Sequence, residues 1–245
     1  MKINLKKTIL ALLVIIMIFG AYKAFELIKQ SKTSKQQPNG VQDLIMGTAT
    51  FTSSDKKITF PYPTVVSGLT TEQTQTFNNF AEKFPEKVYD SQIGEMPNTW
   101  DGSVTVERSD SKIISADMQA VQDFNGAHPM TSNYTINYSV KDSMEVTLQD
   151  LFNEKSDYLN TLSTLVRTRI NEGFRMGGVD PGDIESMIED GTKPDSKNFQ
   201  KFVIGDFYIT FIYDPYEVAP YAYGTRQAMI SFDELKGILK ADLTK

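Results

Sequence analysis

His128 is the only histidine in this chain of 245 residues, and cysteine is absent. A catalytic triad would therefore have to use His128, and a zinc site built from histidines or thiolates is excluded by count. The segment Gly126–Pro129 is typical of a tight connection between strands, so we expect His128 to be a hydrogen-bonded structural residue. The alternative is a second binding site, in which protonation near neutral pH tunes the affinity for a charged partner.

The segment Tyr213–Gly224 (YDPYEVAPYAYG) places four tyrosines and two prolines in a loop that follows an apolar strand pattern. Its carboxylates, Asp214 and Glu217, could serve as a general acid and base on a glycan. Alternatively, they could contact a cationic partner, because opposite charges steer association. The spacing of these two residues does not fix the distance between their carboxylates, so both interpretations stay open.

The tyrosines of this loop also have two interpretations. Tyrosine supplies rigid contact area with a polar tip, which suits an interface anchor. Alternatively, Tyr213 and Tyr221 pack inward while Pro215 and Pro220 shape the loop. We predict no catalytic residue, no metal site and no cofactor. The predicted partner-binding residues are Tyr213, Asp214, Tyr216, Glu217, Pro220, Tyr221 and Tyr223.

The net charge of −6 is unevenly distributed along the chain. Residues 1–35 contain seven lysines and one acidic residue, so residues 36–245 hold 18 basic and 30 acidic residues, a net charge of −12. An acidic body of this kind repels phosphates, which argues against nucleic acid and favours a basic partner or none.

The N-terminal segment predicts a membrane anchor. Residues 8–22 carry no charge, as a cleaved signal peptide would require, but the cut site is poor because Phe19 lies two positions before Ala21. Residues 8–28 are long enough to span a bilayer if Lys23 extends towards the headgroups. We therefore expect a short cytoplasmic tail (residues 1–7), a single-pass transmembrane helix (8–28), a flexible linker (29–43) and an extracytoplasmic domain.

The remaining sequence alternates strand and helix signals. We expect strands over 46–51 and 57–60, the second ended by Pro61 and Pro63. A capping box of Thr70 and Gln73 predicts a helix whose apolar stripe includes Phe77, with a kink or break at Pro85. Further strands are expected over 103–108, 112–123 and 134–140, and the strict alternation of the last predicts that one of its faces is buried.

The second half predicts a long helix over 156–173 and a short helix after Asp180. The Gly205-Asp206 pair predicts a hairpin between strands 199–204 and 207–213, the second apolar enough to be central. A capping box of Ser231 and Glu234 predicts a last helix. Strands outnumber helices and pair by hairpins, so we expect an α+β fold with an antiparallel sheet and packed helices, divided into subdomains 44–128 and 129–245.

A series of short motifs resembles a bacterial extracytoplasmic family, the domains of unknown function found in the lysozyme-sensing anti-sigma factor RsiV and beside the catalytic domain of the peptidoglycan deacetylase PdaC. The resemblance implies an α+β domain held outside the membrane. In RsiV the similar domain binds lysozyme and thereby exposes that protein to regulated cleavage. The matching segments are Lys57–Pro63, Leu69–Phe80, Ile113–Ser115, Gly126–Pro129, Tyr134–Asn137, Val146–Phe152, Tyr213–Gly224 and Ile230–Leu235.

We therefore predict a membrane-anchored, non-catalytic binding or sensing module at the cell envelope. Its expected partners are a cationic wall-lytic protein such as lysozyme, or a peptidoglycan fragment. The first alternative is a glycan-active hydrolase or a deacetylase-like enzyme that uses Asp214 and Glu217. The second is a structural envelope protein whose sheet supports oligomers.

Overall fold

The computed structural model describes residues 41, 43–53, 56–89 and 97–240. The expected transmembrane helix (8–28) and nearly all of the expected linker lie outside these residues, although Asp43, the last linker residue, already belongs to the first strand. Within the described ranges no helix is both long and apolar enough to span a bilayer.

The first two strands, β1 (Asp43–Ser53) and β2 (Lys56–Ser67), form a two-stranded antiparallel sheet. The expectation that Pro61 and Pro63 end the second strand is wrong, because β2 pairs with β1 through both positions. The two prolines are two residues apart, so both backbone nitrogens point to the same edge. A proline is tolerated where its missing N–H faces away from the partner strand.

Helix α2 (Thr71–Val88) begins with the predicted capping box. The Thr70 hydroxyl accepts from the Gln73 backbone N–H, and the Gln73 side chain accepts from the Thr70 N–H, both at 3.2 Å. The helix continues through Pro85 to Val88 instead of ending there. Its apolar stripe packs into a core cluster with β2 and the next sheet, and Phe77 is fully buried in that cluster.

The central sheet consists of β3 (Thr99–Ser109), β4 (Ile113–Asp123), β5 (Met130–Ser139) and the short β6 (Met144–Glu145), in that order. This sheet corrects the expected division at residue 128, because it contains strands from both sides of that residue. β4, before residue 128, pairs with β5, after it, at ten positions. The two core clusters instead divide within β4, where Ile113 belongs to the cluster that contains residues 146–235 and Ile114 belongs to the cluster that contains residues 58–140.

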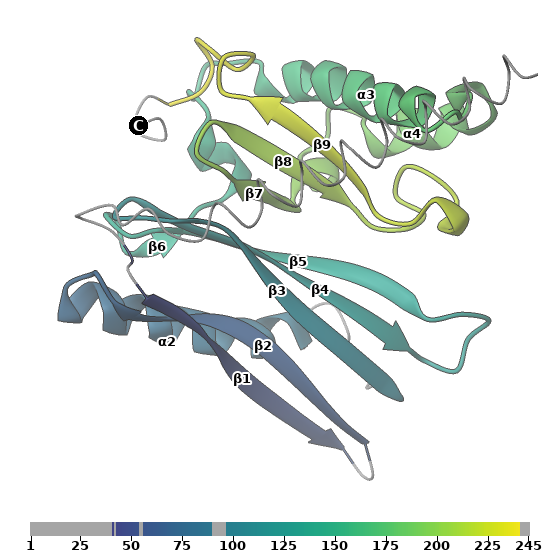
Figure 1. Cartoon of the computed structure of the whole chain (residues 1–245). Helices are drawn as coiled ribbons and strands as arrows, with labels where there is room; N and C mark the ends of the chain where they lie inside the picture. The colour runs from purple at the N-terminus through teal and green to yellow at the C-terminus, as the bar shows by residue number, and fades with distance from the viewer. Residues whose placement is uncertain (1–40, 42, 54–55, 90–96, 241–245) are drawn as a thin grey trace, which may run out of the picture. The chain divides into compact units, whose positions relative to one another are not determined.

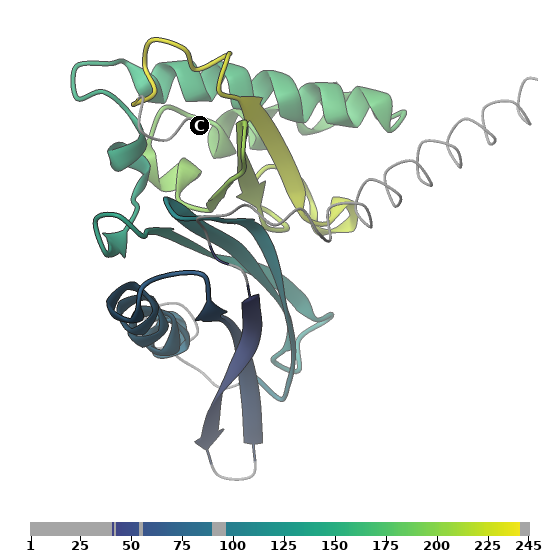
Figure 2. The same cartoon turned by 60° about the vertical axis from the view of Figure 1, so that its left-hand side comes forward.

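The expectation that β5 is buried on one face only is also wrong. Its side chains on both faces are covered near the C-terminal end, where Asn137 and Ser139 are buried as well as Tyr138. The polar face is covered because a second sheet packs on it, as Figures 1 and 2 show.

That second sheet has the order β7 (Phe202–Ile204), β8 (Tyr208–Tyr213) and β9 (Arg226–Ser231), so β8 is central, as predicted. Helices α3 (Tyr158–Met176) and α4 (Glu185–Gly191) lie on the side away from the central sheet (Figure 1). The fold is therefore α+β with antiparallel sheets, as the sequence predicts. The connecting 3-10 turns are η2 (Leu148–Leu151), η3 (Pro181–Ile184), η4 (Ser196–Phe199) and η5 (Tyr221–Tyr223).

The expected last helix does not form, although its capping residues do interact. The Glu234 carboxylate accepts from the Ser231 hydroxyl at 2.7 Å, but the residues that follow are turns. Gly237 has a φ of 91°, a left-handed conformation that ends a helical path. The capping box thus closes a turn at the end of β9.

Candidate functional site

The loop Tyr213–Gly224 lies against the end of α4. A Cβ atom at Gly191 would come within 2.1 Å of the Glu217 carbonyl oxygen, so only glycine permits this approach. Two tyrosines of the loop are structural. Tyr213 is only 2% exposed and belongs to the core, which corrects its expected role in partner binding. Tyr223 packs edge-on against Phe174 of α3, with ring centroids 5.3 Å apart.

Three other predicted residues form an aromatic group at the surface, which we call the aromatic clasp: the exposed Tyr216 and the half-buried His128 and Tyr221. The His128 ring stacks on Tyr221 with centroids 3.6 Å apart, and its Nε2 lies 3.2 Å from the Tyr216 hydroxyl oxygen. The Tyr221 hydroxyl donates to the Pro129 carbonyl oxygen at 2.8 Å. The structure thus joins the β4–β5 connection to the tyrosine loop, two segments that the sequence presented as separate sites.

The aromatic clasp is open to solvent and is held in an unusual backbone conformation. Tyr216 is 51% exposed and has a φ of 76°, in the left-handed region that a bulky residue rarely adopts. Asn125, at the tip of the facing connection, has a φ of 62°, and Phe124 beside it is 40% exposed. Strained residues of this kind persist only where their surroundings hold them, and they are often found at binding sites. Pro220, the remaining predicted loop residue, is half-buried directly before η5.

The two predicted carboxylates are both paired within the protein. Lys201 Nζ lies 2.5 Å from Asp214 Oδ2 and 2.7 Å from Glu217 Oε1. Asp214 also accepts from the Asn133 backbone N–H at 2.9 Å, and Glu217 accepts from the Asp214 backbone N–H at 2.7 Å. This network fixes the start of the tyrosine loop to β5.

Electrostatics keep Lys201 charged in this position. Burial lowers the pKa of Lys201, but the neighbouring Asp214 and Glu217 carboxylates outweigh that effect and leave the pKa above its usual range. Lys201 therefore offsets one of the two negative charges. Glu217 is the more accessible of the two carboxylates, with 39% of its side chain exposed against 11% for Asp214.

Asp117 on β4 is a titratable residue that the sequence analysis did not single out. Burial, and then the carboxylates of Asp214 and Glu107, raise the pKa of Asp117 to about 7, although Lys201 partly opposes them. Its Oδ1 atom is buried, and no hydrogen-bond partner for it is present among the described residues. A carboxylate in the middle of a strand, where aspartate is uncommon, was the available signal.

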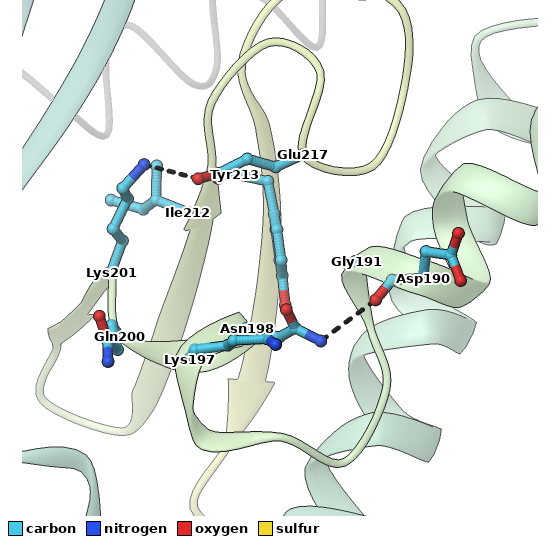
Figure 3. Close-up of a pocket in the computed structure, with 9 residues that line it drawn as sticks. All are labelled: Asp190, Gly191, Lys197, Asn198, Gln200, Lys201, Ile212, Tyr213 and Glu217. Atoms are coloured by element: carbon cyan, nitrogen blue, oxygen red, sulfur yellow. Dashed lines mark hydrogen bonds and ion pairs between the residues drawn. The ribbon is translucent and has the colours of Figure 1, made fainter.

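A cavity of about 370 Å³ lies beside this network, between α4, η4 and β8 (Figure 3). The Lys201–Glu217 ion pair lies at one end and the hydrogen bond from Asn198 to the Asp190 carbonyl oxygen at the other, with the Tyr213 side chain between them. The phenol oxygen of Tyr213 is buried without a partner in the described part of the chain. No group of three histidine, cysteine or acidic residues in that part could hold a metal ion.

This arrangement defines an α+β domain with an aromatic surface at one end of its second sheet, and comparisons with known proteins agree with that description. Residues 149–233 match the family described as "Protein of unknown function (DUF3298)". The peptidoglycan-N-acetylmuramic acid deacetylase PdaC of Bacillus subtilis (strain 168) is 31% identical over 115 residues, which are 47% of this chain and 24% of that protein. The predicted resemblance to PdaC is therefore confirmed, while the resemblance to RsiV stays a prediction.

Two solved structures share the fold. A crystal structure of a DUF3298 family member from Bacteroides fragilis NCTC 9343 has a TM-score of 0.58 and 13% identity, covering 84% of this chain and 96% of its own. A DUF3298 family protein from Pseudomonas aeruginosa PAO1 also has a TM-score of 0.58, with 15% identity over 82% of this chain and 96% of its own. At these identities the likeness shows the fold alone.

Proposed function

We propose that this chain is a membrane-anchored, non-catalytic binding module at the cell envelope, and that the aromatic clasp is its contact surface. The anchor is residues 8–28, and the domain lies on the extracytoplasmic side. The observation that carries the proposal is the exposed, conformationally strained Tyr216 stacked in one group with His128 and Tyr221. Rigid aromatic side chains with polar tips supply contact area at low entropic cost.

Charge supports a cationic partner such as lysozyme. Residues 36–245 have a net charge of −12, which raises the rate of encounter with a basic protein at low salt. The ion pairs of Lys201 determine which acidic residues can attract a basic partner. Asp214 is bound internally, so Glu217 at the rim and the acidic surface as a whole are responsible.

Similarity to PdaC supports a second partner class, a fragment of wall glycan. That protein is named for its action on peptidoglycan, and this chain covers about a quarter of it. Sugar rings stack on exposed aromatic faces much as aromatic rings do, so the aromatic clasp suits either partner. The hydrolase alternative would need a carboxylate free to face a glycosidic bond, whereas Asp214 and Glu217 are both held by internal hydrogen bonds.

The test is calorimetric titration of the full-length chain in detergent with lysozyme and, separately, with soluble peptidoglycan fragments at low salt. We expect saturable binding to one of them, weakened about tenfold or more by Tyr216→Ala, because a central aromatic anchor contributes at least 1–2 kcal/mol. Phe207→Ala is the matched control. Phe207 is an aromatic residue with 67% exposure at the opposite end of β8, so its removal leaves the affinity unchanged.

Two results would contradict the proposal. If neither ligand binds at low salt, the assigned partners are wrong. If reducing ends or acetate are released from purified wall material, and Asp214→Asn and Glu217→Gln abolish the release, the enzymatic alternative replaces a binding module.

A further inference from the structure

Most of β5 has a partner strand on one side only. Strand β6 lies at one end of β5 (Figure 1), where it pairs with Tyr138 and Ser139. The chain then leaves the sheet through Val146 into η2. On its other side β5 pairs with β4 from Met130 to Ser139. Among the described residues, no strand continues the path of β6 beside the rest of β5.

The hydrogen bonds of β5 show which backbone groups face this open edge. Asn133 directs its N–H away from β4, to the Asp214 carboxylate, and Asn137 directs its carbonyl oxygen to the Val146 N–H. Outward and inward residues alternate along an antiparallel strand, so Thr135 between them also faces outward. In the described part of the chain, its N–H and carbonyl oxygen have no hydrogen-bond partner.

A cavity of about 520 Å³ lies along this edge. One wall is apolar and comes from α2 and η2, with Phe84, Val88 and Leu148 all buried. The other wall comes from the residues that enter β7, where Gln200 and Lys201 are polar. The stretch between the bonds at Asn133 and Asn137 is about 14 Å long at the usual rise of a strand.

We infer that this groove binds a short extended peptide of another protein, added as a strand beside β5 through the backbone of Thr135. Side chains of an added strand would alternate between the two walls, so the peptide has apolar residues at every second position. Nearby charges set the polar positions. Lys87, Glu145 and Lys201 line the groove, and both lysines are paired, Lys87 with Glu145 and Lys201 with Asp214 and Glu217 outside the lining. These five groups together carry one net negative charge, which favours basic residues.

This site is separate from the aromatic clasp, so the inference does not depend on the proposed function. The probe is a fluorescein-labelled heptapeptide, blocked at its C-terminus, that alternates lysine or threonine with valine. We expect saturable binding to the full-length chain in detergent by fluorescence anisotropy. Hydrogen exchange should show that the Thr135 amide becomes protected when the peptide is added.

Two comparisons isolate the backbone contacts. Thr135→Pro removes the outward N–H without removing a hydrogen bond to β4, and it should weaken binding about tenfold or more. Thr131→Pro is the matched control, because Thr131 faces the same edge of β5 but lies outside the groove. The second comparison uses the native protein and two probes, one N-methylated on the odd-numbered residues and the other on the even-numbered residues. One of the two should bind about tenfold or more weakly than the unmodified probe, because its methyl groups replace the N–H groups that face β5.

The inference is overturned if the unmodified probe does not bind saturably. It is also overturned if both N-methylated probes bind as well as the unmodified one, or if Thr131→Pro and Thr135→Pro weaken binding equally. The N-methylated probes keep the test decisive even where the Thr135→Pro chain does not fold.

Discussion

The two faces of the central sheet are packed by different kinds of contact. On the side of α2, Tyr134, Ile136 and Tyr138 of β5 are buried in an apolar cluster. Tyr138 lies 5.2 Å from Phe77 and 5.0 Å from Phe80 between ring centroids. Contacts of this kind are large and non-directional, so they contribute free energy of folding roughly in proportion to the area that they bury.

The face towards β7 is joined by directional polar contacts. The Ser115 hydroxyl donates to Asn137 Oδ1 and accepts from the Ile204 N–H, while Asn137 Nδ2 donates to the Phe202 carbonyl oxygen. Arg108, only 3% exposed, reaches the Gly205 carbonyl oxygen. We call this set of contacts the polar seam.

The two faces therefore have different roles: the apolar face contributes stability, and the polar seam fixes the position of the second sheet. Hydrogen bonds contribute little net free energy, but an unsatisfied buried partner costs more. The polar seam therefore permits one placement of β7 and β8 on the central sheet, which also sets where the tyrosine loop meets the β4–β5 connection. The apolar face tolerates changes in packing but not loss of volume.

The largest effect is expected on the apolar face. Phe77→Ala should lower the free energy of unfolding of residues 41–245 by about 3–5 kcal/mol, because it removes a fully buried ring and leaves a cavity. Urea denaturation monitored by circular dichroism measures this change. Phe77→Leu, which keeps more of the volume, gives a smaller loss where the alanine variant does not fold.

Gln75→Ala on the exposed side of α2 is the control, and a change within about 0.5 kcal/mol is expected there. If Phe77→Ala costs no more than Gln75→Ala, the apolar face does not carry the stability assigned to it.

On the polar face, stability should depend on pH through Asp117. The pKa of Asp117 is about 7 in the folded protein because of burial and the charges of Asp214 and Glu107, against 3.8 when unperturbed. The folded state therefore binds this proton more tightly than the unfolded state, so the contribution of Asp117 is most favourable below pH 4. It falls as the pH rises to about 7, and it is constant above that value.

Asp117→Asn removes this dependence. The variant should gain stability over the native protein by at most about 4 kcal/mol at pH 8, from a shift of about three pKa units, and by progressively less towards pH 4. Unfolding free energies at four pH values measure the difference, in which other titrating groups largely cancel. A difference that is flat between pH 4 and pH 8 would show that Asp117 titrates normally in the folded state.

The apolar face was more predictable from the sequence than the polar face. Alternation along 134–140 and the stripe that includes Phe77 identified the surfaces that meet, because apolar periodicity records burial directly. The same alternation made Asn137 look solvent-exposed. Its partners lie in other elements, 22 residues away at Ser115 and 65 residues away at Phe202, and no local pattern records such a contact.

The candidate site divides in the same way. The sequence identified the tyrosine loop and His128 as unusual but could not pair them, since His128 and Tyr216 are 88 positions apart. It also missed Lys201, which occupies both loop carboxylates from 13 and 16 positions away. Local signals likewise failed at Ser231, where a true capping interaction precedes turns instead of a helix.

A smaller effect tests the polar seam itself. Asn137→Ala should lower the free energy of unfolding by about 1–3 kcal/mol, because it leaves the Ser115 hydroxyl and the Phe202 carbonyl oxygen buried with fewer partners. Thr131→Ala, on the same face of β5 but only half-buried, is the control and should change stability by less than about 0.5 kcal/mol.

Position and stability can then be measured separately in the same variant. If the polar seam sets the placement of β8, Asn137→Ala should also increase hydrogen exchange at the Ile204 amide, which donates to Ser115, while amides of α2 keep their protection. Ser115→Ala combined with Asn137→Ala should cost less than the sum of the single changes, since the two residues share one hydrogen bond. Strictly additive costs, with no change in exchange at Ile204, would mean that the two faces of the sheet hold the fold in the same way.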